Sequence, residues 1–282
     1  MPGSMSTAAL TAVLAAAVLH AVWNAMAHRI PDKLVGFALI NCGYTLCAAV
    51  LVCFTPVPSA AAWPFIAASA VLEVASHLFL LRAYQLGDFG QMYPLARGLA
   101  PLLVAVASVT LLGGSLTLPQ ALGVLLVSGG LGALALGSGR IGRAQLPALG
   151  AAVGTGVLIA AYTLVDSSGV RHTDDTLAYI AWLFLLQGPV LPLVAFARRR
   201  GGLFTQVRPV LGTGLTGGVL SMAAYGLVIW AQAHGDVASV AALRETGILV
   251  AAVIATLFFR EPFGRLRLIA GAVMLTGIGL LR

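Results

Sequence analysis

The chain has 282 residues, of which 60% are apolar and 9% carry a charge, and its mean hydropathy is +0.99. A water-soluble globular protein needs more polar residues to cover its surface, so this composition excludes that class and indicates an integral membrane protein. The formal net charge is +7. Because most basic residues lie in short gaps between apolar segments, we interpret them as a signal of membrane orientation and predict no nucleic-acid partner.

Ten apolar segments are long enough to cross a bilayer, whose hydrocarbon core of about 30 Å takes about 20 helical residues. We therefore predict an all-α fold with spans near residues 8–28, 34–54, 64–83, 89–112, 118–137, 147–168, 176–197, 209–232, 237–259 and 266–281. No Lys or Arg precedes the first span, which favours an uncleaved helix over a signal peptide. The connections are too short to hold a separate soluble catalytic domain.

A short segment between two apolar spans occurs twice along the chain. Ala83–Asp88 reads Ala-Tyr-Gln-Leu-Gly-Asp, and Ala231–Asp236 reads Ala-Gln-Ala-His-Gly-Asp in the same setting. This echo predicts a duplicated unit of five spans, with one copy at residues 8–137 and the other at 147–281. Two similar halves packed in a bilayer are typical of secondary transporters.

The basic residues between the spans are distributed unevenly. The connections after odd-numbered spans carry twelve of the 16 Lys and Arg, namely Arg29, Lys33, Arg82, Arg140, Arg143, Arg198, Arg199, Arg200, Arg208, Arg260, Arg265 and Arg267. The even connections and the two ends of the chain carry only Arg171 and Arg282. The positive-inside rule predicts that the odd connections are cytoplasmic and that both termini lie on the non-cytoplasmic side. Since each unit has an odd number of spans, the second unit must be inverted relative to the first, as a 5+5 inverted repeat.

Several short motifs follow one another along these spans. They are His20-Ala21-Val22-Trp23-Asn24, Gly87-Asp88, Tyr93-Pro94-Leu95-Ala96-Arg97-Gly98, Ala242-Leu243-Arg244-Glu245-Thr246 and Arg260-Glu261-Pro262. The ordered set resembles the EamA-type branch of the drug/metabolite transporter superfamily, in its ten-helix, two-repeat form, over about residues 8–281. The resemblance implies a transporter that exports small organic metabolites or drug-like solutes, often in exchange for protons. The first unit departs from the pattern, because Gly113-Gly114 stands where the family has Gly-Glu.

Glu73 and His77 are the leading candidates for substrate binding or coupling. A charged side chain at the centre of a membrane helix costs about 3 kcal/mol or more unless it is paired or hydrated, so an intramembrane carboxylate is a functional candidate by default. Glu73 lies near the centre of the third span, and His77 is four residues on, hence on the same face. A carboxylate beside an imidazole can accept and release a proton. The structural alternative is that Arg97 or a neighbouring helix neutralises Glu73.

Arg97 lies in the fourth span between two structural prolines, Pro94 and Pro101. Proline removes a backbone donor, and irregular backbone at membrane depth is tolerated where protein or a water-filled cavity satisfies it, so a cavity wall is expected here. Arg244 is the equivalent residue of the second unit and adjoins Glu245. Adjacent helical residues point about 100° apart, so one of these two can face the cavity and the other a partner helix. A guanidinium suits the carboxylate of an organic anion or zwitterion, and an internal salt bridge is the alternative.

The first span of each unit supplies further cavity candidates, which are His20, Trp23, Asn24 and Tyr162. First helices of repeats line the central path in many transporters. Tyr225 is another candidate, because it takes the place of His77 in the second unit. Asp166 lies near the end of the sixth span and is expected at the water boundary instead.

Asp88 and Asp236, the most obvious echo, each precede a helix and are predicted to be structural N-caps. No Walker loop, dinucleotide fingerprint or His-Glu-x-x-His motif occurs, so we predict no cofactor and no metal. The sequence predicts a secondary transporter of the inner membrane, a monomer or homodimer, whose partners are a small-molecule substrate, protons and the lipid bilayer. The alternatives are an uncoupled facilitator or channel, and a membrane-embedded enzyme with Glu73 and His77 as acid and base.

Overall fold

The computed structural model describes residues 6–137, 142–199, 203–259 and 265–281, and helices dominate all four ranges. The long helices are α1 (Thr7–His28), α2 (Lys33–Leu51), α3 (Trp63–Leu86), α4 (Phe89–Thr110), α5 (Leu118–Gly137), α6 (Leu146–Gly169), α7 (Thr176–Gln187), α8 (Val190–Arg199), α10 (Leu211–Ala233), α11 (Val237–Arg244), α12 (Thr246–Phe259) and α13 (Arg265–Leu280). Shorter elements join them: η1 (Arg143–Gln145), η2 (Val170–His172), α9 (Leu203–Val207) and η4 (Arg208–Val210).

Among the described residues, 9 helical stretches are long and apolar enough to cross a membrane, and α13 adds a shorter apolar helix at Leu268–Leu280. These ten spans lie where the hydropathy pattern predicts them, so the all-α, ten-helix fold is confirmed. The Arg260-Glu261-Pro262 motif, like Arg140, Arg200 and Arg282, lies outside the described residues.

Two spans that the sequence predicts as continuous are interrupted. The seventh is split between α7 and α8 at Gly188 and Pro189, where proline lacks the backbone donor that a continuous helix needs. The ninth is split between α11 and α12 at Glu245. The fourth span, by contrast, keeps its helical backbone through Pro94 and Pro101. The irregular backbone expected around Arg97 is therefore found in the equivalent span of the second half.

The bundle exposes apolar side chains and buries polar ones. Large apolar residues on the outer faces are well exposed, for example Val106 (61%), Leu136 (65%) and Leu193 (64%). The buried charged residues are Glu73, Arg97, Asp166, Arg244 and Glu245. Lipid solvates apolar side chains but not unpaired charges, so this distribution is the one that a bilayer favours.

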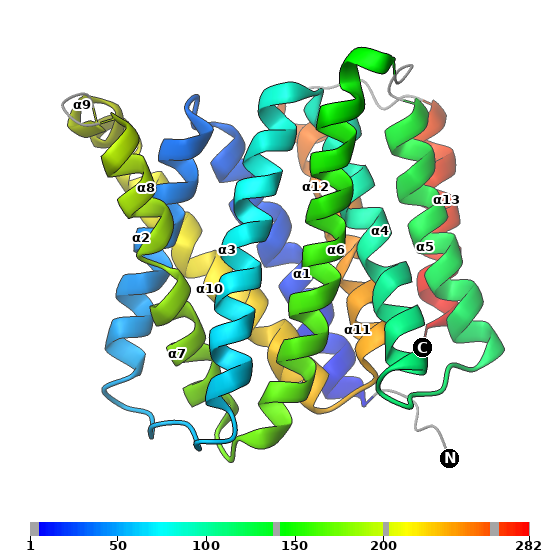
Figure 1. Cartoon of the computed structure of the whole chain (residues 1–282). Coiled ribbons are helices and arrows are strands. Elements are labelled where there is room, and N and C mark those ends of the chain that lie inside the picture. The colour runs from blue at the N-terminus through cyan, green and yellow to red at the C-terminus, as the bar shows by residue number, and fades with distance from the viewer. Residues whose placement is uncertain (1–5, 138–141, 200–202, 260–264, 282) are drawn as a thin grey trace.

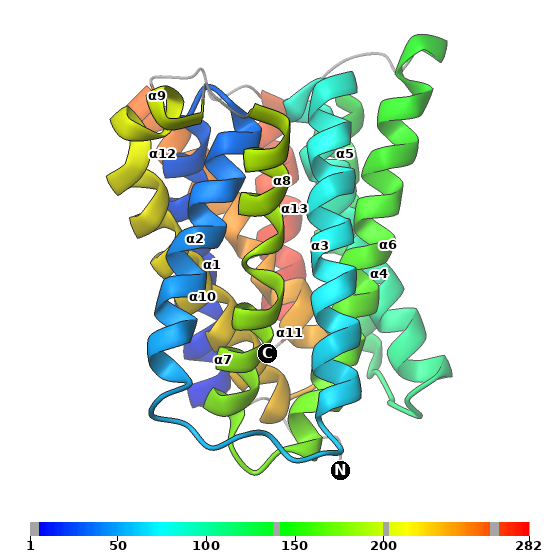
Figure 2. The ribbon, with the colours of Figure 1, turned by 60° about the vertical axis from the view of Figure 1, so that its left-hand side comes forward.

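The connections gather at two opposite ends of the bundle (Figures 1 and 2). The helix ends on either side of the odd-numbered connections lie at the upper end of Figure 1, which we call the basic end because it carries Arg29, Arg82, Arg143, Arg198, Arg199 and Arg208. The even connections and the start of α1 lie at the other end, which we call the opposite end. Consequently α1 starts at the opposite end, whereas α6, the first long helix of the second half, starts at the basic end.

Several contacts between helices occur in pairs. Each of these contacts has a counterpart in which both helices are replaced by their equivalents from the other half. α3 packs on α6 as α10 packs on α1, and α3 packs on α7 as α10 packs on α2. α4 packs on α6 as α12 packs on α1. Contacts between equivalent helices, α5 with α13 and α4 with α11, join the halves directly. The two halves therefore contribute alike to the interior of the bundle.

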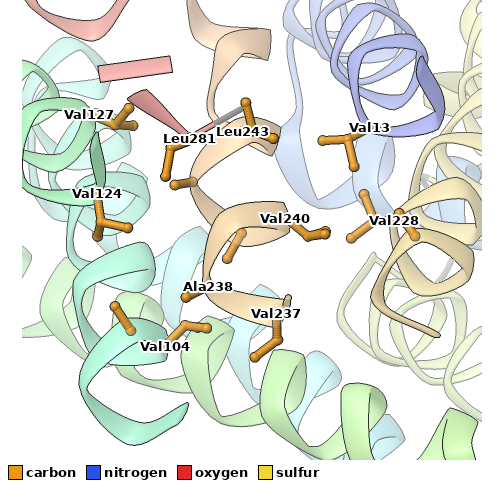
Figure 3. Close-up of a cluster of buried hydrophobic side chains, with 14 of the residues drawn as sticks. Val13, Val104, Val124, Val127, Val228, Val237, Ala238, Val240, Leu243 and Leu281 are labelled. Carbon is orange, nitrogen blue, oxygen red and sulfur yellow. The ribbon is translucent and has the colours of Figure 1, made fainter. Parts of the chain in front are cut away.

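The short helix α11 is enclosed on all sides. All of its residues, Val237 to Arg244, are buried. Figure 3 shows its side chains among neighbours from four other helices, namely Val13 of α1, Val104 of α4, Val124 and Val127 of α5, and Val228 of α10. A helix that is apolar on every face belongs in a core. By ending inside this core, α11 brings Arg244 and Glu245 to the interior of the bundle.

The close approach of α2 and α10 depends on glycine. A Cβ atom at Gly218 would collide with the carbonyl oxygen of Ile40 and lie 2.7 Å from the Cα of Gly43. A Cβ at Gly214 would collide with the side chain of Leu39. Small residues allow membrane helices to approach closely, and here they bring α10 directly against α2.

We expect Gly218→Ala to lower the free energy of unfolding by about 1–3 kcal/mol, because the added methyl group overpacks a backbone contact. The unfolding midpoint of the purified protein in detergent measures this effect. Gly212→Ala in the same helix is the matched control, since a Cβ there meets nothing within 4 Å. Equal midpoints for the two variants would show that the α2–α10 contact does not need glycine.

Candidate functional site

A cavity of about 80 Å³, the central cavity, lies between the two halves. Helices α1 to α4 contribute from the first half, and α6, α7, α10 and α11 from the second. The lining residues are Ala16, His20, Trp23, Phe37, Ile40, Asn41, Tyr44, Glu73, His77, Arg97, Tyr162, Phe184, Ser221, Ala224, Tyr225, Val228 and Arg244. Sites for drug-sized ligands span about 300–1,000 Å³, so in this conformation the cavity suits a small solute.

The structure brings most of the predicted site residues to this cavity. Those that line it are His20, Trp23, Glu73, His77, Arg97, Tyr162, Tyr225 and Arg244. Asn24 and Glu245 do not line it. The Asn24 side chain donates a hydrogen bond to the carbonyl oxygen of His20 in its own helix (2.8 Å), and Glu245 lies behind the cavity wall.

A buried ion pair joins the two halves behind the cavity. Arg97 Nε of α4 donates to Glu245 Oε2 at 2.9 Å, and the Glu245 side chain is 0% exposed. Arg244 Nε lies 3.6 Å from the other carboxylate oxygen of Glu245. Arg97 thus belongs to an internal salt bridge while also lining the cavity, and Glu245 faces two guanidinium groups at the break between α11 and α12.

The cluster of these three side chains carries one positive charge in excess, two guanidinium groups against one carboxylate. Arg244 is 3% exposed, and its Nε and Nη2 atoms have no hydrogen-bond partner among the described residues. A buried charge is costly unless it is paired and hydrogen-bonded. This cluster therefore favours an anionic group on any solute that enters the cavity.

The first half supplies an acidic wall. Glu73 of α3 is 6% exposed, and its Oε1 atom has no hydrogen-bond partner in the part of the chain that the structure describes. The ion pairs found within the described residues do not include Glu73, so Arg97 does not neutralise it. His77 lies on the same wall, where its ring contacts Phe37 edge-on with centroids 5.6 Å apart. The cavity therefore combines a carboxyl group from one half with a guanidinium group from the other.

Asp166 is fully buried, and the expectation that it lies at the water boundary is wrong. Its carboxylate accepts hydrogen bonds from the hydroxyl groups of Tyr225 (2.6 Å) and Tyr179 (2.9 Å). α6 continues beyond it to Gly169, so the polar run after Asp166 belongs to the helix and not to a loop. Through Tyr225, which lines the cavity, Asp166 is a second buried carboxylate next to the candidate site.

The contribution of α2 and α7 to the cavity wall was not predicted from the sequence. Phe37 and Tyr44 come from α2 and Phe184 from α7, and the rings of Tyr44 and Phe184 meet edge-on with centroids 4.8 Å apart. Asn41 of α2 also lines the cavity and accepts a hydrogen bond from Tyr44 (2.5 Å). The spacing of residues 37, 41 and 44 on one helical face was the available signal.

Residues 146–282 match the EamA-like transporter family. The second half of the chain is therefore an EamA-like transporter domain. A solved crystal structure, described only as that of a protein, is similar over 99% of both chains with a TM-score of 0.77 and 20% identity. At that identity the likeness shows the fold alone, which here extends through the first half of the chain. No curated protein matches the chain.

The EamA-type resemblance, predicted from the ordered motifs, is thus confirmed by the domain in the second half, and the protein is a membrane transporter. Three of the motifs meet at the cavity. The Nε2 atom of His20, in the first motif, lies 3.4 Å from the hydroxyl oxygen of Tyr93, in the third motif. Arg97 of the third motif binds Glu245 of the fourth.

The echoed aspartates of this EamA-like transporter lie away from the cavity lining. Asp88 accepts a hydrogen bond from the backbone N–H of Gly90 (2.7 Å), and Asp236 accepts one from that of Ser239 (2.7 Å). Both side chains therefore cap the first turn of a helix, α4 and α11 respectively. Their part is to fix the start of the two helices that carry Arg97 and Arg244.

Proposed function

We propose that this EamA-like transporter is a secondary active exporter of a small organic metabolite or drug-like solute, working by alternating access and coupled to protons. The observation that carries the proposal is the central cavity, which both halves line and which combines Glu73 with the incompletely paired Arg244. Substrate sites near the midplane between two halves are typical of secondary transporters.

The proposal treats residues 8–137 and 147–281 as inverted EamA-type repeats. Two observations support this: α1 and α6 start at opposite ends of the bundle (Figure 1), and the helix contacts correspond when the halves are exchanged. Rocking of one half against the other then moves the opening of the cavity from one end to the other. By the positive-inside rule the basic end is cytoplasmic and both termini lie outside.

The charges of the cavity favour particular roles. An anionic group of the solute, such as a carboxylate, would bind Arg244, whose planar guanidinium can bind two oxygens. Glu73, with His77 on the same helix, would carry the proton, because an intramembrane carboxylate takes up or releases a proton as its surroundings change. Arg97 and Glu245 would hold Arg244 in place.

Transport into everted membrane vesicles, with and without a pH gradient, tests the function. A growth-resistance screen of overproducing cells against metabolites and drugs identifies the solute first. A coupled exporter accumulates it only with the gradient, and a facilitator equilibrates it regardless of the gradient. Release of product without accumulation would establish a membrane-embedded enzyme and refute the proposal.

We expect Arg244→Gln to weaken apparent affinity for the identified anionic or zwitterionic solute by about 10- to 100-fold, since a hydrogen bond to a charged group contributes about 1.5–3 kcal/mol. The concentration dependence of uptake measures this change. Arg171→Gln is the control, because Arg171 is exposed at the opposite end and lies outside the cavity. An unchanged affinity in Arg244→Gln would remove this residue from the binding site.

A further inference from the structure

A second pocket, of about 370 Å³, opens at the basic end of the bundle. The start of α2, the end of α3 and the end of α8 form it, so both halves contribute. It is lined by Asp32, Lys33, Leu34, Leu81, Tyr84, Gln85, Arg198 and Arg199, and we call it the vestibule. Its volume falls within the range of about 300–1,000 Å³ that is common for ligand sites.

The vestibule has a net positive charge. Lys33, Arg198 and Arg199 contribute three positive charges and Asp32 one negative charge, which leaves +2. Arg199 Nη2 donates to Asp32 Oδ2 at 2.5 Å, and this pair connects α8 to the start of α2. With side chains 43% and 27% exposed, the pair lies at the water boundary. A pocket of this charge attracts anions and repels cations.

A cluster of apolar side chains lies between the vestibule and the central cavity. Leu34 and Leu81 line the vestibule and pack in one cluster with Leu191 of α8. Phe37 packs against this cluster and also lines the central cavity, where it contacts His77. To reach the central cavity, an anion in the vestibule would therefore have to pass between these apolar side chains.

Aromatic contacts fill the seam between α3 and the seventh span at the opposite end. Tyr84 lines the vestibule, whereas Gln232, which takes its place in the echoed segment, is 0% exposed. Ring contacts close the seam between α3 and the α7 region there: Trp63 meets Trp182 at 5.2 Å, and Phe65 stacks on His172 at 4.8 Å. In this conformation the space between α3 and the seventh span opens toward the basic end.

We propose that the vestibule is a peripheral anion-binding site at the basic-end mouth of the transport pathway. It receives the carboxylate or phosphate group of the solute before the solute passes the Leu34–Phe37–Leu81–Leu191 layer toward Arg244. This inference rests on the proposed transport function and goes beyond it, because it assigns a second site and a direction of access. Organic cations would be excluded at this mouth.

Cysteine labelling tests the site without knowledge of the solute. In a variant in which Cys42, Cys47 and Cys53 are replaced by alanine, Gln85→Cys is labelled with a negatively charged sulfonate and a positively charged trimethylammonium methanethiosulfonate of similar size. We expect the anionic reagent to react faster, and Arg198→Gln to lower the anionic-to-cationic rate ratio about fivefold at low salt, with the difference fading as salt is added. Ala144→Cys in η1 is the control, because it lies at the same end outside the vestibule. If Arg198→Gln leaves the anionic-to-cationic rate ratio at Gln85→Cys unchanged, the proposal is overturned.

Two sources of anionic group need to be separated. If a dissolved anion binds, millimolar inorganic phosphate should slow labelling of Gln85→Cys in detergent. If labelling of Gln85→Cys is slowed only in vesicles that contain phosphatidylglycerol, and not in phosphatidylcholine vesicles, the vestibule binds a lipid headgroup. That result would overturn its role as a mouth for solute.

Transport of the solute identified by screening shows whether the vestibule lies on the transport pathway. Labelled Gln85→Cys should lose at least about 90% of its flux, and labelled Ala144→Cys should keep it. Continued flux through labelled Gln85→Cys would show that the vestibule is not on the pathway, while the transport function itself stands. If the protein shows the expected anionic-to-cationic labelling ratio but transports no solute, the transport function is refuted. The vestibule's role as a mouth is then refuted with it.

Discussion

Glu245→Gln is expected to lose about 3–5 kcal/mol of stability together with most of its transport activity. Its carboxylate is fully buried, binds Arg97 at 2.9 Å and lies 3.6 Å from Arg244 Nε. Removing one partner of a buried ion pair leaves an uncompensated charge in a medium that solvates it poorly. The isosteric amide would leave two guanidinium groups without a counter-charge between the halves.

A double-mutant cycle isolates this interaction. Arg97→Gln and Glu245→Gln should each destabilise the protein, whereas the double variant should recover at least about 1 kcal/mol relative to their sum, because the Arg97–Glu245 interaction is lost only once. Unfolding of the purified proteins in detergent provides the free energies. Arg199→Gln is the control for an exposed ion pair, and about 1 kcal/mol or less is expected there. If Glu245→Gln cost no more than this control, the pair would not be what joins the halves.

Glu73→Gln is expected to abolish accumulation driven by a pH gradient while flux down the solute's own gradient persists. A difference of one pH unit corresponds to about 1.4 kcal/mol, or a tenfold accumulation for one-to-one exchange. Glutamine keeps the size and hydrogen-bonding groups of the side chain but cannot carry the proton. The accumulation ratio in everted vesicles should therefore fall from about tenfold to unity.

Asp166→Asn is the matched comparison for Glu73→Gln, since Asp166 is another buried carboxylate near the cavity. Two tyrosine hydroxyl groups already bind Asp166. We therefore expect its replacement to lower stability and to leave coupling in place. Retained tenfold accumulation in Glu73→Gln would exclude Glu73 as the proton carrier, and loss of accumulation in Asp166→Asn alone would transfer that role to Asp166.

Most of the candidate site could be predicted because the bilayer makes buried polar residues rare. Glu73, His77, Arg97 and Arg244 interrupt long apolar runs, and each lines the cavity. Asn24 was equally polar, yet its side chain binds the backbone of its own helix. Periodicity places a residue on a helix face but does not say which neighbour that face meets. A polar residue that binds its own helix therefore cannot be distinguished in the sequence from one that lines a cavity.

Aromatic residues were harder to assign for the same reason. Phe37, Tyr44 and Phe184 are largely apolar, like lipid-facing side chains. The spacing of residues 37, 41 and 44 places them on one helical face, but it does not show whether that face meets a cavity or the bilayer. Asp166 was misplaced because Ser167, Ser168 and Gly169 resemble the end of a span. In the structure α6 continues past them, and two tyrosine hydroxyl groups from other helices satisfy the carboxylate.

The sequence by itself determined that the chain is a ten-helix membrane protein with an EamA-like transporter domain, and which ends of the helices carry positive charge. Those properties follow from local composition, because a hydrocarbon layer selects segments by length and polarity. Only the tertiary structure decided that Arg97 pairs with Glu245, 148 residues away, and that Arg244 is left to face the cavity. Pairing at such separation depends on how the helices pack, and the break at Glu245 that makes it possible lies in a stretch whose residues are compatible with a continuous helix.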